Sequence, residues 1–168
     1  AALLDAMNRG VVAHAVLDVF ENEPVGPVAI MKKADIITPH IAGYSLEGRM
    51  NGTVLVYHEL CNFLKVVPTW RPTLDRAASR PLTLGKSGKS VESVLLELIR
   101  QTYDIERDDH ALRESLALDD NRRGRHFEEL RVQYPIRHEW ACYTVDARAA
   151  DSEVIKKIRG VGFAKINE

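Results

Sequence analysis

The first 65 residues alternate short apolar runs with helix-like segments, and this order restricts the fold more than any other feature of the sequence. Residues 11–20 form a largely apolar run that suits a strand covered on both faces, and residues 35–38 form a shorter run. Helical patterns precede, separate and follow the two runs, at residues 1–10, 26–33 and 45–65. We therefore expect the last part of a doubly wound parallel α/β sheet.

The segment from Ser45 to Lys65 has the clearest helical pattern in this region. Ser45 suits an N-cap because its hydroxyl can accept a hydrogen bond from a backbone N–H group of the first turn. Apolar residues then recur every three or four positions, which places them on one face of a helix: Leu46, Met50, Val54, Tyr57, Cys61 and Leu64.

A domain boundary is expected between Val66 and Pro72, where two prolines favour an extended linker. The predicted domains are thus residues 1–65 and residues 66–168, the second being a small α/β module. Its expected elements are a strand at 81–84, a helix capped by Ser90, a charged loop with a short helix at 104–125, helical turns at 127–134, a strand at 140–145 and a last helix capped at 151 or 152. Two strands are marginal alone, so we expect packing partners from self-association.

Composition and charge narrow the class of protein. The 168 residues are 45% hydrophobic and 28% charged with a net charge of −1, which is typical of a globular domain and gives no general argument for nucleic acid or an anionic membrane as partner. No apolar run is long enough for a membrane span, and the N-terminus does not resemble a signal peptide. The two cysteines, Cys61 and Cys142, lie far apart, which favours reduced thiols in a cytoplasmic protein.

Polar side chains follow both apolar runs of the first region, at the sheet edge where ligands bind in open α/β folds. Asp18 and Glu23 follow the first run, and His40 and Gly43 follow the second. A histidine can remove the proton of a hydroxyl group near neutral pH, and a carboxylate beside it favours the charged ring. Glu23 and His40 end neighbouring strands, so we expect them to meet. On residue types alone, however, such a histidine is more often a surface residue than a catalyst.

Two segments resemble the signatures of the D-2-hydroxyacid dehydrogenases, which are NAD-dependent enzymes with a Rossmann-type sheet. Residues 17–24, LDVFENEP, resemble one signature, and residues 39–43, PHIAG, resemble the second. The two segments have the order and the separation along the chain that the family's signatures have. The resemblance implies that His40 is the catalytic acid/base and Glu23 its partner carboxylate. It also implies that Asp18 and Gly43 contact NAD.

Residues 40–53 resemble one branch of this family, which acts on a small phosphorylated hydroxy acid, and residues 103–109, 112–113 and 137–140 resemble its C-terminal dimerisation domain. The resemblance implies that Tyr44 contacts the substrate and that a homodimer forms through residues 66–168. The Gly-rich turn GxGxxG and the substrate-binding arginine segment are absent from the sequence. We therefore expect a C-terminal fragment that is inactive alone and does not bind NAD measurably. The alternatives are a dimerisation module without catalysis and another D-2-hydroxyacid dehydrogenase with an unrelated tail.

Three further patterns have simpler interpretations. Residues 83–90 nearly match the phosphate-binding GxxxxGK[ST] loop, but Thr83 replaces its first glycine, and a turn followed by a helix cap explains the pattern better. The basic cluster at 122–125 is expected to be a solvated loop, although it could approach a phosphorylated substrate in a partner's site. The histidines outside position 40 show no spacing that demands a metal.

Overall fold

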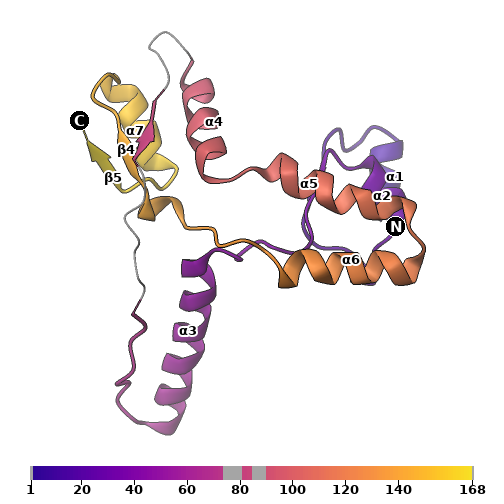
Figure 1. The fold of residues 1–168 in the computed structure, drawn as a ribbon, viewed down its shortest axis with the longest axis horizontal. Coiled ribbons are helices and arrows are strands. Elements are labelled where there is room, and N and C mark those ends of the chain that lie inside the picture. Colours follow the sequence, from indigo (N-terminus) through magenta and orange to yellow (C-terminus); the bar gives the residue numbers. More distant parts are fainter. Residues whose placement is uncertain (1, 74–80, 85–89, 168) are drawn as a thin grey trace. The chain divides into compact units, whose positions relative to one another are not determined.

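Two compact units make up the chain, and each contains two separate segments. The computed structural model describes residues 2–73, 81–84 and 90–167 (Figure 1). The first unit combines residues 1–42 with 104–135, and the second combines residues 43–103 with 136–168. In the description below, unit 1 and unit 2 refer to these two groups.

Unit 1 begins with the element order that the sequence predicts. Helix α1 (Ala2–Asn8) is followed by strand β1 (Val16–Leu17), helix α2 (Val28–Lys33) and strand β2 (Ile36–Ile37). The two strands are parallel, with Val16 opposite Ile36 and Leu17 opposite Ile37. The mixed α/β class with a parallel sheet is thus confirmed. The first strand is far shorter than its apolar run, because the pairing with β2 covers only two residues and Val16 itself is largely exposed.

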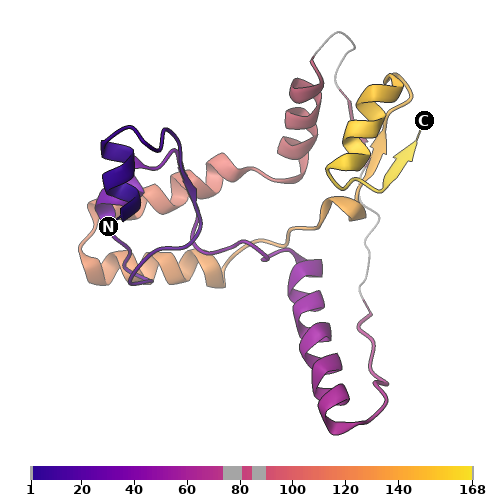
Figure 2. The same cartoon turned by 180° about the vertical axis from the view of Figure 1, so that it is seen from behind.

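The charged segment from 104 to 125 is helical, so the prediction of a loop with a short helix was wrong. Helix α5 (Ile105–Glu114) continues into the 3-10 turn η1 (Ser115–Ala117), and α6 (Asp120–Val132) follows. Asp104 and Asp119 accept hydrogen bonds from backbone N–H groups of the first turns, as N-cap residues do. Figures 1 and 2 show α5 and α6 side by side.

One hydrophobic core joins the two segments of unit 1. Leu112 of α5 and Phe127 of α6 are almost fully buried and pack in the same cluster as Met31 and Ile37. The sequence predicted two successive domains that meet near residue 66, whereas the packing interleaves the segments. The reason is that Leu112 and Phe127 bury their apolar surface against residues 1–42. The domain boundary predicted between Val66 and Pro72 stays a prediction for the whole protein.

Unit 2 contains a parallel sheet of three strands in the order β3-β4-β5. These are β3 (Leu82–Thr83), β4 (Thr144–Asp146) and β5 (Lys165–Asn167). The sequence predicted only two strands here, because β5 is short and mostly polar. The strand predicted at 140–145 begins late, since residues Trp140–Cys142 form the 3-10 turn η2.

Helices α4 (Val91–Thr102) and α7 (Ser152–Gly160) cover the three-stranded sheet. Their apolar residues share one core with β3 and β4, and Figure 2 shows α7 beside β4 and β5. Ser90 caps α4 as predicted, and Asp151 caps α7. The loop that resembles a phosphate-binding turn includes residues 85–89, which lie outside the described residues.

Helix α3 (Leu46–Leu64) confirms the predicted long helix and its cap. The Ser45 hydroxyl accepts a hydrogen bond of 2.9 Å from the Gly48 backbone N–H. Of the predicted apolar face, Cys61 is buried, but Leu64 is exposed. Among the described residues, no helix is long and apolar enough to cross a membrane.

Candidate active site

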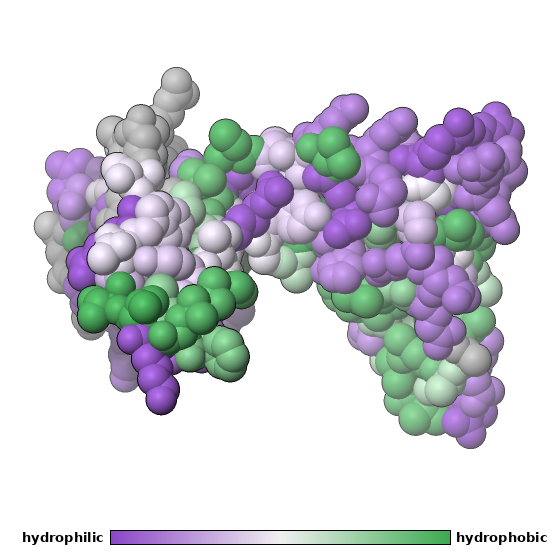
Figure 3. Space-filling view, turned by 90° about the horizontal axis from the view of Figure 1, so that it is seen from below, coloured by the Kyte–Doolittle hydropathy of each residue, from purple (hydrophilic) through white to green (hydrophobic). Residues whose placement is uncertain are grey.

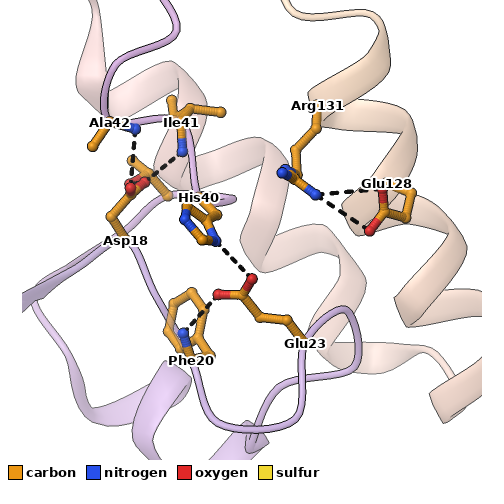
Figure 4. A network of polar contacts seen from close by, with 9 residues as sticks. Asp18, Phe20, Glu23, His40, Ile41, Ala42, Glu128 and Arg131 are labelled. Carbon is orange, nitrogen blue, oxygen red and sulfur yellow. Dashed lines mark hydrogen bonds and ion pairs between the residues drawn. The ribbon is translucent and has the colours of Figure 1, made fainter. Parts of the chain in front are cut away.

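The edge formed by the carboxyl ends of β1 and β2 places three predicted site residues close together. Asp18 follows β1 directly, and His40 lies three residues beyond the end of β2. Glu23 lies in the segment that follows Asp18. Because β1 and β2 are parallel, both segments leave the sheet at the same edge (Figure 4). All three residues belong to unit 1.

His40 and Glu23 are in direct contact, as the sequence predicted. Nδ1 of His40 lies 2.8 Å from Oε2 of Glu23. The other carboxylate oxygen of Glu23 accepts a hydrogen bond of 2.8 Å from the backbone N–H of Phe20. The carboxylate is thus fixed at both oxygens (Figure 4), and the imidazole ring is oriented by it. The side chain of His40 is 46% exposed, so its second nitrogen, Nε2, can reach a ligand.

Asp18 organises the segment that carries His40. Its carboxylate accepts hydrogen bonds from the Thr38 hydroxyl at 2.6 Å, from the Ile41 N–H at 2.8 Å and from the Ala42 N–H at 2.9 Å. These contacts bracket His40 on both sides in the chain. Both oxygens of Asp18 are therefore engaged by the protein itself. Its contact with NAD, implied by the family resemblance, stays a prediction.

The backbone of His40 adopts a left-handed conformation with a φ angle of 55°. This conformation is uncommon for a residue other than glycine and costs on the order of 1–3 kcal/mol. The hydrogen bonds to Asp18 from the next two residues hold it in place. Strain of this kind concentrates at functional sites, where it fixes the direction of a side chain.

The last two predicted site residues, Gly43 and Tyr44, belong to unit 2. Gly43 has a φ angle of 87°, which favours glycine, and an added Cβ atom would meet open space. The Arg49 guanidinium lies over the Tyr44 ring, 5.0 Å from its centroid. The roles of Gly43 toward NAD and of Tyr44 toward the substrate stay predictions.

The basic cluster at 122–125 lies on α6 rather than on a loop. Arg122 pairs with Asp119 at 2.6 Å. Arg123 is buried, contacts Asp120 and donates a hydrogen bond to the Val25 carbonyl oxygen. Arg123 therefore has a structural role in unit 1.

Asp109 of α5 supports the site edge, and it was not among the residues predicted for the site. Its carboxylate accepts a hydrogen bond of 2.7 Å from the backbone N–H of Ile37, at the end of β2. Arg113 pairs with Asp109 at 2.8 Å and donates hydrogen bonds to the carbonyl oxygens of Met31 and Ala34. The spacing of Asp109 and Arg113 is typical of a helical ion pair and was the signal that could have revealed the helix.

Two segments of the chain match families of known proteins. Residues 1–42 match the family described as D-isomer specific 2-hydroxyacid dehydrogenase, NAD binding domain. Residues 73–162 match a family described as a domain of unknown function, DUF3410. The first match contains Asp18, Glu23 and His40, and the second covers α4 to α7.

Several relatives carry the name erythronate-4-phosphate dehydrogenase. The relative from Proteus mirabilis is 40% identical over 147 residues, which cover 86% of this chain and 37% of the relative. The relative from Salinibacter ruber is 40% identical over 156 residues, covering 90% of this chain and 40% of the relative. The relative from Marinobacter nauticus is 33% identical over 165 residues, covering 96% and 42%.

The chain thus spans about two-fifths of the length of the curated relatives it matches. The matches nevertheless extend over most of the chain, through both its first 42 residues and the region from 73 to 162. The chain belongs to the DUF3410 family through residues 73–162, which are more than half of its length, and its residues 1–42 are similar to the NAD binding domain of the D-isomer specific 2-hydroxyacid dehydrogenases.

Proposed function

We propose that this chain is the C-terminal part of an NAD-dependent erythronate-4-phosphate dehydrogenase. The whole enzyme would oxidise the 2-hydroxyl group of 4-phospho-D-erythronate to the 2-oxo acid, in pyridoxal phosphate biosynthesis in the cytoplasm. The observation that carries the proposal is the 2.8 Å contact of His40 with Glu23 at the sheet edge. The names of the relatives support the choice of substrate.

His40 is the proposed acid/base of this reaction, and Glu23 is its partner. When the secondary alcohol is oxidised, its hydroxyl proton moves to Nε2 of His40, while the hydride leaves the same carbon. NAD⁺, when bound, supplies the hydride acceptor. The carboxylate of Glu23 stabilises the positive charge that the ring gains, and its contact with Nδ1 leaves Nε2 for the substrate. In the reverse direction, His40 returns the proton to the oxo group.

The residues present fit the reactive end of this cofactor better than its phosphates. The exposed ring of His40 lies at the sheet edge where dinucleotides bind in this class of fold. Asp18, with both oxygens engaged, would act mainly by holding the His40 segment in place. The sequence contains no GxGxxG turn for the pyrophosphate. We therefore propose that the chain alone does not bind NAD measurably, which a calorimetric titration showing micromolar affinity would contradict.

A chimaera tests the catalytic proposal. The 168 residues replace the matching C-terminal part of the Proteus mirabilis relative, and NADH formation from 4-phosphoerythronate is measured. We expect activity in the chimaera and its loss in the His40→Asn and Glu23→Gln variants. The matched control is His14→Asn, because His14 also contacts a carboxylate in unit 1, that of Asp35, at 3.0 Å. A folded chimaera without activity, or equal losses at His14 and His40, would contradict the proposal.

The second candidate function is dimerisation through the C-terminal region. Large apolar side chains of unit 2 within residues 66–168 are strongly exposed, among them Val67 and Ile136. Figure 3 shows hydrophobic surface beside hydrophilic surface on the face that it views. Since exposed apolar side chains favour contact with a partner, we propose that a second copy covers those of unit 2. Sedimentation velocity of the chain would show a dimer, and Ile136→Glu would shift it toward monomer. A monomer at all concentrations would contradict this role.

A further inference from the structure

Three side chains with metal-binding atoms converge in unit 2. Glu47 lies in the first turn of α3, His138 precedes η2, and Cys142 ends η2. A carboxylate oxygen, a ring nitrogen and the sulfur of these residues all lie within 4.8 Å of one another. All three residues are partly buried. No other group of three such residues converges in this way within the part of the chain that the structure describes.

Hydrogen bonds fix the two chain segments that carry these side chains. Nδ1 of His138 lies 2.8 Å from Oε1 of Glu47, and the backbone N–H of Glu139 donates to Oε2 at 2.9 Å. The Leu46 N–H also donates to the carbonyl oxygen of Arg137 at 2.7 Å. These hydrogen bonds therefore hold the potential ligands near each other.

The types of donor atom select the class of ion. Thiolate, imidazole and carboxylate are the ligands of Zn²⁺, which takes four of them in a tetrahedral arrangement. Ca²⁺ and Mg²⁺ prefer oxygen atoms alone. Three protein ligands leave a fourth position for water. We propose that Glu47, His138 and Cys142 bind one zinc-class divalent cation, which ties the first turn of α3 to the segment before β4.

The thiol distinguishes this cluster from a simple ion pair. The part of the chain that the structure describes has two other histidine–carboxylate contacts, His14 with Asp35 and His40 with Glu23. Neither belongs to a group of three metal-binding residues among the described residues. A contact that only joined α3 to the neighbouring segment would need Glu47 and His138 but not Cys142.

Cobalt titration of the complete chain tests the proposal, because Co²⁺ substitutes for Zn²⁺ and is coloured. We expect one Co²⁺ per chain, with a thiolate charge-transfer band in the near ultraviolet that Zn²⁺ abolishes by displacement. Cys142→Ser should remove the band. His138→Gln should weaken the affinity for Co²⁺ by at least about tenfold, because even residues that only contact a metal ligand cause a loss of that size when they are replaced. The control Cys61→Ala removes the other thiol, which is buried in α3, and should keep the band.

A second measurement uses the unaltered protein, so that it does not depend on how the variants fold. Zn²⁺ should slow the modification of Cys142 by a thiol reagent, as read by peptide mass spectrometry. Absence of a thiolate band in the unaltered chain would overturn the proposal. So would an unchanged band in Cys142→Ser, or equal modification of Cys142 with and without Zn²⁺.

Discussion

Two histidine–carboxylate pairs, one in each unit, have the same chemistry but opposite surroundings. In unit 1, His40 is 46% exposed, and its backbone is held in a strained conformation. In unit 2, the side chains of His138 and Glu47 are only 28% and 12% exposed, and a thiol lies beside them. The exposure and backbone strain of His40 suit a residue that exchanges protons with a ligand. The burial of His138 and the neighbouring thiol suit a residue that joins two segments or binds a metal ion.

The largest expected effect separates the two pairs by activity. In the chimaera, His40→Asn should lower kcat by about 10²- to 10⁴-fold, the usual contribution of a general acid or base. Asparagine tolerates the left-handed backbone, so the fold should be retained. Steady-state NADH formation measures kcat, and far-ultraviolet circular dichroism measures whether the fold is retained. Since the His14→Asn control should keep its activity, a loss of less than about tenfold in His40→Asn would count against the catalytic role.

Acid stability should depend on the pair in unit 2. Burial opposes the ionisation of Glu47, but hydrogen bonds from His138, from the Glu139 backbone and from Cys142 lower its pKa in the folded protein from 4.5 to about 2. Between these two values the unfolded chain therefore binds more protons than the folded protein. The stabilisation is present above about pH 4.5 and is lost as the pH falls toward 2. It amounts to at most on the order of 3 kcal/mol.

Urea unfolding at about pH 6 and about pH 3 measures this dependence. The Glu47→Gln variant should lose less stability between the two pH values than the unaltered chain. The matched control is Glu59→Gln, at an exposed position of the same helix. Parallel pH profiles for the unaltered chain and Glu47→Gln would show that the Glu47–His138 contact does not stabilise the folded protein.

The sequence predicted the contact of unit 1 but not the cluster of unit 2, for a physical reason. Glu23 and His40 follow two parallel strands, so the geometry of the sheet alone brings them together. Glu47 and His138 are 91 residues apart, and no repeating pattern links a helix start to the segment before a strand. Only the packing of unit 2 brings them into contact.

The prediction of the elements differed in the same way. Helix α3 was predicted closely, because its cap and apolar spacing are local signals. In α5 and α6, the few buried positions, such as Leu112 and Phe127, are separated by many charged residues, so the apolar pattern was too weak to identify. Strand β5 was missed because two of its three residues are exposed. The lengths of β1 and β2 depend on how the two strands pair with each other, and no local sequence pattern specifies this pairing.

Removal of the Asp18 carboxylate should have an intermediate effect. In Asp18→Ala, the N–H groups of Ile41 and Ala42 and the Thr38 hydroxyl lose their acceptor. We expect a loss of about 1–3 kcal/mol in the free energy of unfolding, because Ile41 and Thr38 are buried and an unsatisfied buried donor is costly. Hydrogen exchange should show faster exchange of the Ile41 and Ala42 amides.

Asp5→Ala is the control for this substitution. Asp5 pairs with Arg9 where both side chains are 65% exposed, and such surface pairs contribute about 0–1 kcal/mol. Unchanged exchange at Ile41 and Ala42 in Asp18→Ala would contradict the role of Asp18 in holding the His40 segment.

The smallest expected effect concerns helix caps, which should act equally in both units. Asp119 accepts a hydrogen bond of 2.9 Å from the Arg122 N–H at the start of α6, and Asp151 accepts one of 2.9 Å from the Val154 N–H at the start of α7. Replacing either with alanine should cost about 1 kcal/mol, since the lost contact is local. Asp119 also pairs with Arg122, but both side chains are more than half exposed, so this pair adds little. Urea unfolding of the two variants should therefore give similar losses, and a loss more than about 2 kcal/mol larger for one of them would mean that its cap also supports the packing of its unit.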